Sequence, residues 1–207
     1  MNHGHLQHAL AYNEIKTFWR SVDDSVHVSC MKRVLCILEN GFEEIETVAP
    51  VDLLRRAGVE VMIAGVHSLT ATGRSGISIL ADALLAEMDL GEFDVLFLPG
   101  GPAVMNLRNN PLVIDLIREF SGKGKIIAAI CAAPMLLKDA GILDGKAFTA
   151  HFSTQAELPS TTGERVVEDG NLITSRGAGT AVELGLALIR KLHGEAAATE
   201  VSKAIMA

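Results

Sequence analysis

Short, continuous apolar runs alternate with longer segments of helical periodicity along most of this chain. Runs typical of strands buried on both faces occupy residues 34–38, 59–64, 94–98 and 126–130. Helices are predicted at residues 43–56, 111–120, 132–140, 180–193 and 195–205. This alternation indicates an α/β fold, in which helices cover both faces of a mostly parallel sheet.

Three other stretches carry weaker strand signals. Residues 69–80 are rich in Gly, Ser and Thr and are expected to form a small hairpin beside the sheet. Residues 147–150 and 172–175 are expected to be later strands. Ligands of such sheets bind beyond the carboxyl ends of the strands. Residues that directly follow the strands are therefore the candidates for a site.

Cys131 lies at the junction between the apolar run 126–130 and a new helix. A side chain at a strand-to-helix turn is pushed clear of the sheet, as in a nucleophile elbow. Pro134 falls in the first turn of that helix, where its missing N–H costs nothing. The helix N-terminus, with its free N–H groups and positive dipole, favours thiolate over thiol. We predict a reactive cysteine; a buried structural cysteine is the alternative.

Three carboxylates crowd the first turn of the helix 43–56, after the first strand. Glu43 and Glu46 are neighbours at i, i+3, while Glu44 points elsewhere. We interpret Glu43 and Glu44 as residues whose negative charges stabilise the positive end of the helix dipole. Glu46 is expected to turn toward Cys131, where its carboxyl stays protonated and hydrogen-bonds the sulfur. Such a carboxyl can exchange a proton with a bound substrate.

Two further features follow predicted strands. Gly100-Gly101 is either an ordinary turn or a place where glycines leave room for a substrate. In the second case the N–H groups of Gly101 and Ala132 become oxyanion donors. His151 comes just after residues 147–150 and is the only histidine at a plausible strand end. We predict that His151 is a catalytic residue; a structural role is the alternative.

Composition narrows the classes of protein that fit. The 207 residues are 49% hydrophobic and carry a formal net charge of −7, which indicates one soluble globular domain. An acidic balance without a basic block argues against a nucleic-acid partner or a polyanionic membrane. No apolar run approaches the ~20 residues of a membrane span.

The cysteines indicate the compartment. Cys30, Cys36 and Cys131 form no CxxC pair and no metal spacing, so we expect neither a disulfide scaffold nor a metal site. A reducing, cytoplasmic setting fits best. Cys36 lies inside the apolar run 34–38 and is expected to be inert core, and Cys30 has no assigned role.

Residues 1–30 differ from the rest of the chain. They contain His3, His5 and His8 and have no clear period, and no basic segment precedes an apolar one as in a signal peptide. We expect an N-terminal extension that is loosely attached, followed by one α/β domain at residues 31–207. Metal binding by the histidines is the alternative to a solvated tail.

The ordered segments ENGFEEIETVAPVDLLRRAGVEV, FDVLFLPGG, IIAAICAAP, the following His151 and LITSRGAGT resemble the ThiJ/PfpI superfamily. The match is best with its branch of the Parkinson's-disease-associated protein deglycase, and it runs from about Met31 to the C-terminus. The resemblance implies a flavodoxin-like three-layer sandwich, usually a homodimer. It also implies that Cys131 is the nucleophile and Glu46 the protonated carboxyl beside it, with His151 nearby.

The same resemblance assigns the backbone of Gly101 and Ala132 as oxyanion donors. Members of the branch are described as glutathione-independent glyoxalases, deglycases, holdase chaperones and oxidation sensors. An enzyme of the glyoxalase III or protein deglycase type is therefore expected, acting without a cofactor on methylglyoxal, glyoxal or their early adducts with protein amines and thiols. The alternative is an oxidation sensor or holdase chaperone, in which Cys131 becomes a sulfinic acid.

Three positions depart from related families. Ala132 stands where PfpI-type peptidases carry a histidine after the cysteine, which argues against a protease. Ser153 stands where related glutamine amidotransferases carry a carboxylate, so a Cys-His-Glu triad is not evident. In the deglycase branch an arginine of the partner subunit often reaches the site. Arg74 is the candidate here, although its register is one residue off.

Overall fold

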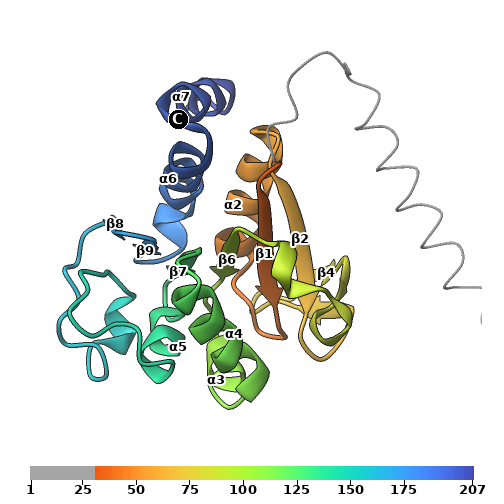
Figure 1. The fold of residues 1–207 in the computed structure, drawn as a ribbon, viewed down its shortest axis with the longest axis vertical. Helices are drawn as coiled ribbons and strands as arrows, with labels where there is room; N and C mark the ends of the chain where they lie inside the picture. Colours follow the sequence, from red (N-terminus) through yellow and green to blue (C-terminus); the bar gives the residue numbers. More distant parts are fainter. Residues whose placement is uncertain (1–30) are drawn as a thin grey trace, which may run out of the picture. The chain divides into compact units, whose positions relative to one another are not determined.

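A seven-stranded sheet forms the centre of the part of the chain that the computed structural model describes, residues 31–207 (Figure 1). Its strand order is β5-β2-β1-β6-β7-β9-β8. The strands are β1 (Arg33–Leu38), β2 (Glu60–Gly65), β5 (Ala83–Leu84), β6 (Val95–Leu98), β7 (Ile126–Ile130), β8 (Val166–Asp169) and β9 (Leu172–Ser175). Neighbouring strands are parallel except for β8 and β9, which confirms the mostly parallel sheet.

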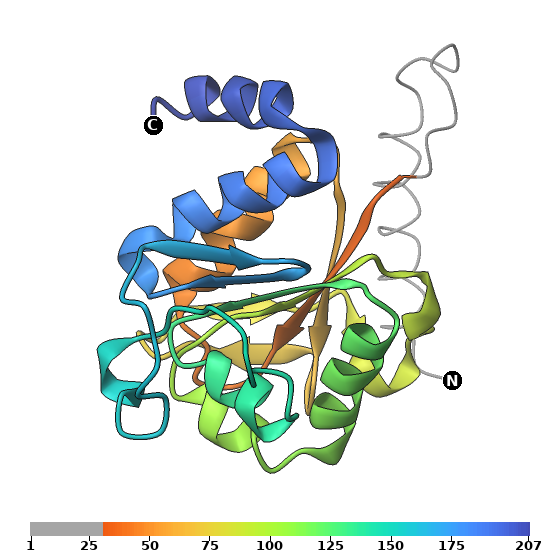
Figure 2. The ribbon, with the colours of Figure 1, turned by 60° about the vertical axis from the view of Figure 1, so that its left-hand side comes forward.

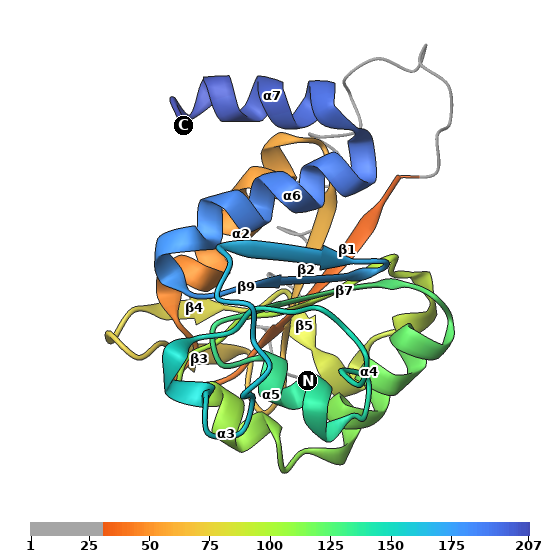
Figure 3. The same ribbon diagram turned by 90° about the vertical axis from the view of Figure 1, so that its left-hand side faces the viewer.

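Helices cover both faces of this sheet, as predicted (Figure 2, Figure 3). One layer contains α2 (Glu44–Arg56), α6 (Ala181–His193) and α7 (Glu195–Ala204). The opposite layer contains α3 (Ala103–Leu107), α4 (Pro111–Gly122) and α5 (Pro134–Asp139). The result is the expected three-layer sandwich. None of the helices in residues 31–207 is both long enough and apolar enough to cross a membrane.

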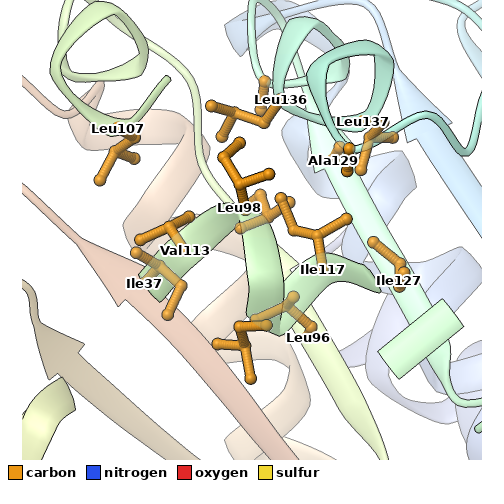
Figure 4. Close-up of a cluster of buried hydrophobic side chains, with 14 of the residues drawn as sticks. Ile37, Leu96, Leu98, Leu107, Val113, Ile117, Ile127, Ala129, Leu136 and Leu137 are labelled. Atoms are coloured by element: carbon orange, nitrogen blue, oxygen red, sulfur yellow. The ribbon is translucent and has the colours of Figure 1, made fainter. Parts of the chain in front are cut away.

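The central strands read as continuous apolar runs because both of their faces are buried. In β1, Leu35 and Ile37 pack into the hydrophobic cluster beneath α4, while Val34 and Cys36 pack into the cluster beneath α6. Figure 4 shows the first cluster, in which strand side chains meet those of α3, α4 and α5. Burial of this apolar surface is the main stabilising contribution to the fold.

The weak segment 69–80 forms the expected side hairpin. Its two strands, β3 (Thr70–Thr72) and β4 (Ser78–Leu80), pair antiparallel outside the main sheet. The hairpin is tied to α2, because Glu44 Oε1 accepts a hydrogen bond of 2.7 Å from the N–H of Ser75. This contact places the hairpin beside the first turn of α2.

One predicted strand was wrong. Residues 147–150 are an irregular segment rather than a strand, because β7 pairs directly with β9 and leaves no position in the sheet between them. The helix expected at residues 132–140 is confirmed as α5, although it begins at Pro134, since the residues after Cys131 form a turn. The antiparallel edge strand β8 was not predicted. The expectations for residues 1–30, including His3, His5, His8 and Cys30, concern residues outside the described part.

Candidate active site

Cys131 follows β7 directly and has a backbone φ of 64°. This left-handed conformation is unusual for a residue other than glycine and stores backbone strain. Two hydrogen bonds of 2.8 Å hold it there. The Cys131 N–H donates to the carbonyl of Ser175, and the Cys131 carbonyl accepts from the N–H of His151. The predicted elbow is therefore fixed between the end of β9 and the segment that begins at His151.

Glu46 reaches the sulfur of Cys131 from the first turn of α2. Its side chain is 1% exposed and is hydrogen-bonded to the Cys131 side chain. Glu46 Oε2 also accepts from the N–H of Gly100 at 3.1 Å, and the N–H of Ala178 donates to the same carboxyl. The carboxyl is thus held by the segments that follow β6 and β9.

The other two acidic residues of this turn serve the fold. Glu43 is the N-cap of α2, and its Oε2 accepts from the N–H of Glu46 at 2.7 Å. Glu44 binds the turn of the β3–β4 hairpin through Ser75. Glu43 has the expected role at the helix end, and Glu44 adds a link that the sequence did not indicate.

Gly100 and Gly101 allow the backbone to approach the reactive pair. A Cβ at Gly100 would lie 2.5 Å from Glu46 Oε2 and 2.6 Å from the Cβ of Cys131, so a side chain does not fit there. Gly101 has a φ of 91°, and a Cβ there would meet the carbonyl oxygen of Gly41 at 2.5 Å. The N–H groups of Gly101 and Ala132 are hydrogen-bonded to the Cys131 sulfur. Both predicted backbone donors therefore converge on the nucleophile.

Opposing effects set the protonation of the pair. Burial, and then the charge of the Glu46 carboxylate, raise the pKa of the Cys131 thiol to about 12, although the N–H groups of Gly101 and Ala132 lower it in part. The N–H groups thus favour the thiolate, as expected, while burial and the Glu46 charge oppose them. Burial raises the pKa of Glu46 to about 7, and the charge of Glu43 adds to this effect. The pair keeps a proton at neutral pH, because two acids in a largely dry site resist double ionisation.

His151 adjoins the pair through its backbone and lies on the wall of a cavity. Its ring Nδ1 is 2.8 Å from Ser153 Oγ, and the ring stacks at 4.1 Å on that of Phe152. No hydrogen bond in residues 31–207 joins the imidazole to the Cys131 sulfur. Ser153, in place of a carboxylate, is thus the ring's partner. Arg74 lies in the hairpin turn, where its N–H donates to the Phe42 carbonyl.

A cavity of ≈ 570 Å³ adjoins Glu46 through Gly177 and Ala178, although neither Cys131 nor Glu46 lines it. Its lining includes His151, Phe152 and the segment after β9, which contains Arg176. Sequence reasoning treated this last segment as a turn and missed the N–H of Ala178 as a donor to Glu46. The glycines of LITSRGAGT were the available signal. Across the described residues, no three His, Cys, Asp or Glu side chains gather as a metal site would require.

Comparisons with known proteins agree with this geometry. The profile of the DJ-1/PfpI family matches residues 32–191. The chain is 41% identical to protein dj-1beta of Drosophila melanogaster over 181 residues, which are 84% of this chain and 97% of that protein. It is 34% identical to deglycase PfpI of Pyrococcus furiosus, over 71% of this chain and 91% of that protein.

The solved structures give the same result for the fold. The crystal structure of Drosophila melanogaster DJ-1beta matches with a TM-score of 0.82 and 39% identity, over 85% of this chain and 98% of the other. The structure of oxidized Toxoplasma gondii DJ-1 matches with a TM-score of 0.81 and 29% identity, over 84% and 98%. The expected flavodoxin-like fold is thereby confirmed.

Proposed function

The chain belongs to the DJ-1/PfpI family, and we propose that it is a cysteine-dependent, glutathione-independent glyoxalase or deglycase. Its substrates are methylglyoxal, glyoxal or their early adducts with protein amines and thiols. One observation carries the proposal: the strained Cys131 has Glu46 and two backbone N–H groups on its sulfur. The printed name of the Pyrococcus relative, a deglycase, supports the same class of reaction.

In the first step the Cys131 sulfur attacks the aldehyde carbon of methylglyoxal. The thiol proton moves to the Glu46 carboxylate, a C–S bond forms, and the carbonyl electron pair becomes an oxyanion. The N–H groups of Gly101 and Ala132, which point at the sulfur, are placed to stabilise this charge. Glu46 then returns the proton to the oxyanion and gives a neutral thiohemiacetal.

In the second step Glu46 moves a proton between adjacent carbons. The carboxylate removes the proton from the carbon bound to sulfur and delivers it to the neighbouring carbonyl carbon, through an enediol. The product is a lactoyl thioester of Cys131. Water adds to the thioester, the C–S bond breaks, and lactate leaves with the thiol restored. His151 is a positioning residue in this scheme, because its N–H holds the Cys131 carbonyl.

The chemistry needs a reduced thiol, which favours a reducing compartment such as the cytoplasm.

An exposed apolar patch on α2 and the hairpin has no part in this chemistry. Ile45 and Val48 on α2, with Ile77 and Leu80 on the adjacent hairpin, are each about half exposed, at 55%, 49%, 58% and 58%. Exposed apolar side chains on two neighbouring elements are typical of an interface. We assign it to a second copy of the chain, as in a homodimer.

The proposal is tested by lactate formation from methylglyoxal in the absence of glutathione. Wild type should form lactate, whereas Cys131→Ala should not, with circular dichroism showing that it folds. Cys30→Ala is the control for removal of a thiol without an assigned role. Lactate from Cys131→Ala would refute the mechanism, and no lactate from folded, fully reduced wild type would refute the activity.

Oxidation sensing is the second candidate, and the donors at the sulfur favour it. The N–H groups of Gly101 and Ala132, with a protonated Glu46, could each donate to an oxygen of a Cys131 sulfinic acid. Cys36 is 0% exposed, whereas Cys131 is partly exposed and has these donors on its sulfur. Mild peroxide should therefore add two oxygens at Cys131 and none at Cys36, as read by peptide mass spectrometry. Equal oxidation of both cysteines would contradict a sensing role.

A further inference from the structure

Arg176 is a cation without an acidic partner in the part of the chain that the structure describes. It follows β9 and is exposed, and its Nη1 donates to the carbonyl of Gly163 at 3.3 Å. Arg165 lines the same cavity but is bound at 2.7 Å to Glu183 and at 3.0 Å to the carbonyl of Gly179. The guanidinium of Arg176 therefore has N–H donors that are available to a ligand. Most N–H donors of Arg165 are already hydrogen-bonded within the protein.

The cavity that contains Arg176 adjoins the Glu46 end of the reactive pair. Gly177, next in the chain, lines this cavity, and a Cβ there would be 3.5 Å from the ring of His151 and 3.9 Å from Glu46 Oε1. The N–H of Ala178, one residue further, donates to Glu46. A substrate bound to the Cys131 sulfur would therefore direct its remaining atoms past Gly177 into this cavity.

The lining of the same cavity includes an apolar surface. Phe152 is 80% exposed, although it is a large hydrophobic side chain, and it lines the cavity. An apolar ring and a free guanidinium in the lining of one cavity fit a ligand with a short apolar stem and an anionic end. A carboxylate suits the planar fork of arginine, since it accepts two parallel hydrogen bonds.

We propose that Arg176 binds a carboxylate on the part of the substrate that remains outside the reactive pair. The preferred substrates are then adducts of an α-dicarbonyl with a thiol or amine compound that carries a carboxylate near the reacting carbon. This inference rests on the proposed function and specifies its substrate class. Arg176 has no part in the steps assigned to Cys131 and Glu46.

Two matched hemithioacetals test the assignment: those of methylglyoxal with N-acetylcysteine and with N-acetylcysteine amide. They differ by one carboxylate, and they are compared at equal concentrations of free methylglyoxal. Wild type should show a kcat/KM about 3- to 10-fold higher for the carboxylate adduct, the range of a partly exposed ion pair. Arg176→Gln should bring the ratio to one. Lys123→Gln, which makes the same charge change at the residue that follows α4, should leave the ratio unchanged.

Equal kcat/KM values for the two adducts in wild type, or a preference that survives in Arg176→Gln, would overturn the assignment. Turnover of free methylglyoxal reports on the proposed function separately. Should no substrate be turned over, Cys131→Ala protein is titrated calorimetrically with S-lactoyl-N-acetylcysteine and with its amide. Tighter binding of the acid that disappears in Cys131→Ala/Arg176→Gln supports the subsite. Equal affinities refute it.

Discussion

The Glu46 carboxyl is hydrogen-bonded to the Cys131 thiol, and burial raises the pKa of both groups. Above a pH of about 7 the pair carries one negative charge and one proton, and below it the pair is neutral. A single proton moved along this hydrogen bond converts the thiol into a thiolate. The site therefore stores its nucleophile as a protonated pair and forms the thiolate when a substrate arrives.

Glu46→Gln should separate nucleophilicity from catalysis. Without the carboxylate charge the pKa of Cys131 falls, so alkylation by iodoacetamide should reach its half-maximal rate at a lower pH. Turnover should nevertheless fall by about 100-fold or more, because glutamine cannot carry the proton. Glu44→Gln alters a carboxylate of the same helical turn that binds Ser75, and it should change neither property. Near-wild-type turnover in Glu46→Gln would remove Glu46 from the mechanism.

Gly100→Ala should damage the site through contact alone. The added methyl would lie 2.5 Å from Glu46 Oε2 and 2.6 Å from the Cβ of Cys131, so one of these groups must move. Overpacking of this kind costs about 1–3 kcal/mol in unfolding free energy, and the hydrogen bond between the pair should lengthen.

Lactate assays and urea unfolding measure the two effects. Gly122→Ala is the matched control, since a Cβ there meets nothing within 4 Å. It should be neutral or slightly stabilising. A fully active Gly100→Ala protein would show that the close approach at Gly100 has no bearing on the chemistry.

The main elements were predictable because buried strands and helices have recognisable patterns of apolar residues in the sequence. β1 and β7 lie between two helical layers, so both faces are apolar and the runs are continuous. The same signal misled at residues 147–150. Phe148 is buried there, but the segment forms no backbone ladder with a strand, and its N–H groups bond side chains, as from Thr149 to Thr174 Oγ1 at 2.9 Å. Burial alone does not distinguish a strand from a buried loop.

The site was predictable to a different degree for each residue. Cys131, Glu46 and Gly101 could be placed because each lies beyond the carboxyl end of a predicted strand, either in the turn that follows it or in the first turn of the next helix. The raised pKa of Cys131 could not, since it depends on how dry the pocket is and on the contact with Glu46. Ala178 acts only through its backbone N–H, which any residue offers, so the neighbouring glycines could mark the segment but not this donor.

The pH dependence of stability follows from the pKa of Glu46. Burial raises this pKa from 4.5 to about 7 in the folded protein, so the folded state binds the proton more tightly than the unfolded chain. The stabilising contribution is complete below a pH of about 4.5 and is lost as the pH rises through about 7. On this account the free energy of unfolding of wild type, relative to Glu46→Gln, should fall by on the order of 3 kcal/mol between these limits.

Urea unfolding of both proteins at several pH values measures this difference. Subtracting Glu46→Gln removes the contributions of the other titratable groups, which the two proteins share. The thiol of Cys131 enters only above its ordinary pKa of 9, outside this window. A difference that stays constant, or that grows with pH, would contradict a raised pKa for Glu46.

The apolar patch on α2 and β4 should hold two copies of the chain together. Val48→Lys/Leu80→Lys places two positive charges on the patch, and in a symmetric dimer each charge also faces the patch of the other copy. Burying such charges without partners is costly, so the dissociation constant should rise by at least about 10-fold.

Sedimentation equilibrium over a range of concentrations measures this change. Met105→Lys/Leu112→Lys is the control, because both side chains are exposed apolar residues of the opposite helical layer, at 55% and 40%. It should sediment as wild type does. The patch adjoins the hairpin turn that carries Arg74, because Glu44, which precedes Ile45, binds this turn through Ser75. A monomeric wild type would refute the dimer, and a dimer unaffected by the α2–β4 charges but lost in the control would place the interface elsewhere. Either result would exclude Arg74 from a partner's site.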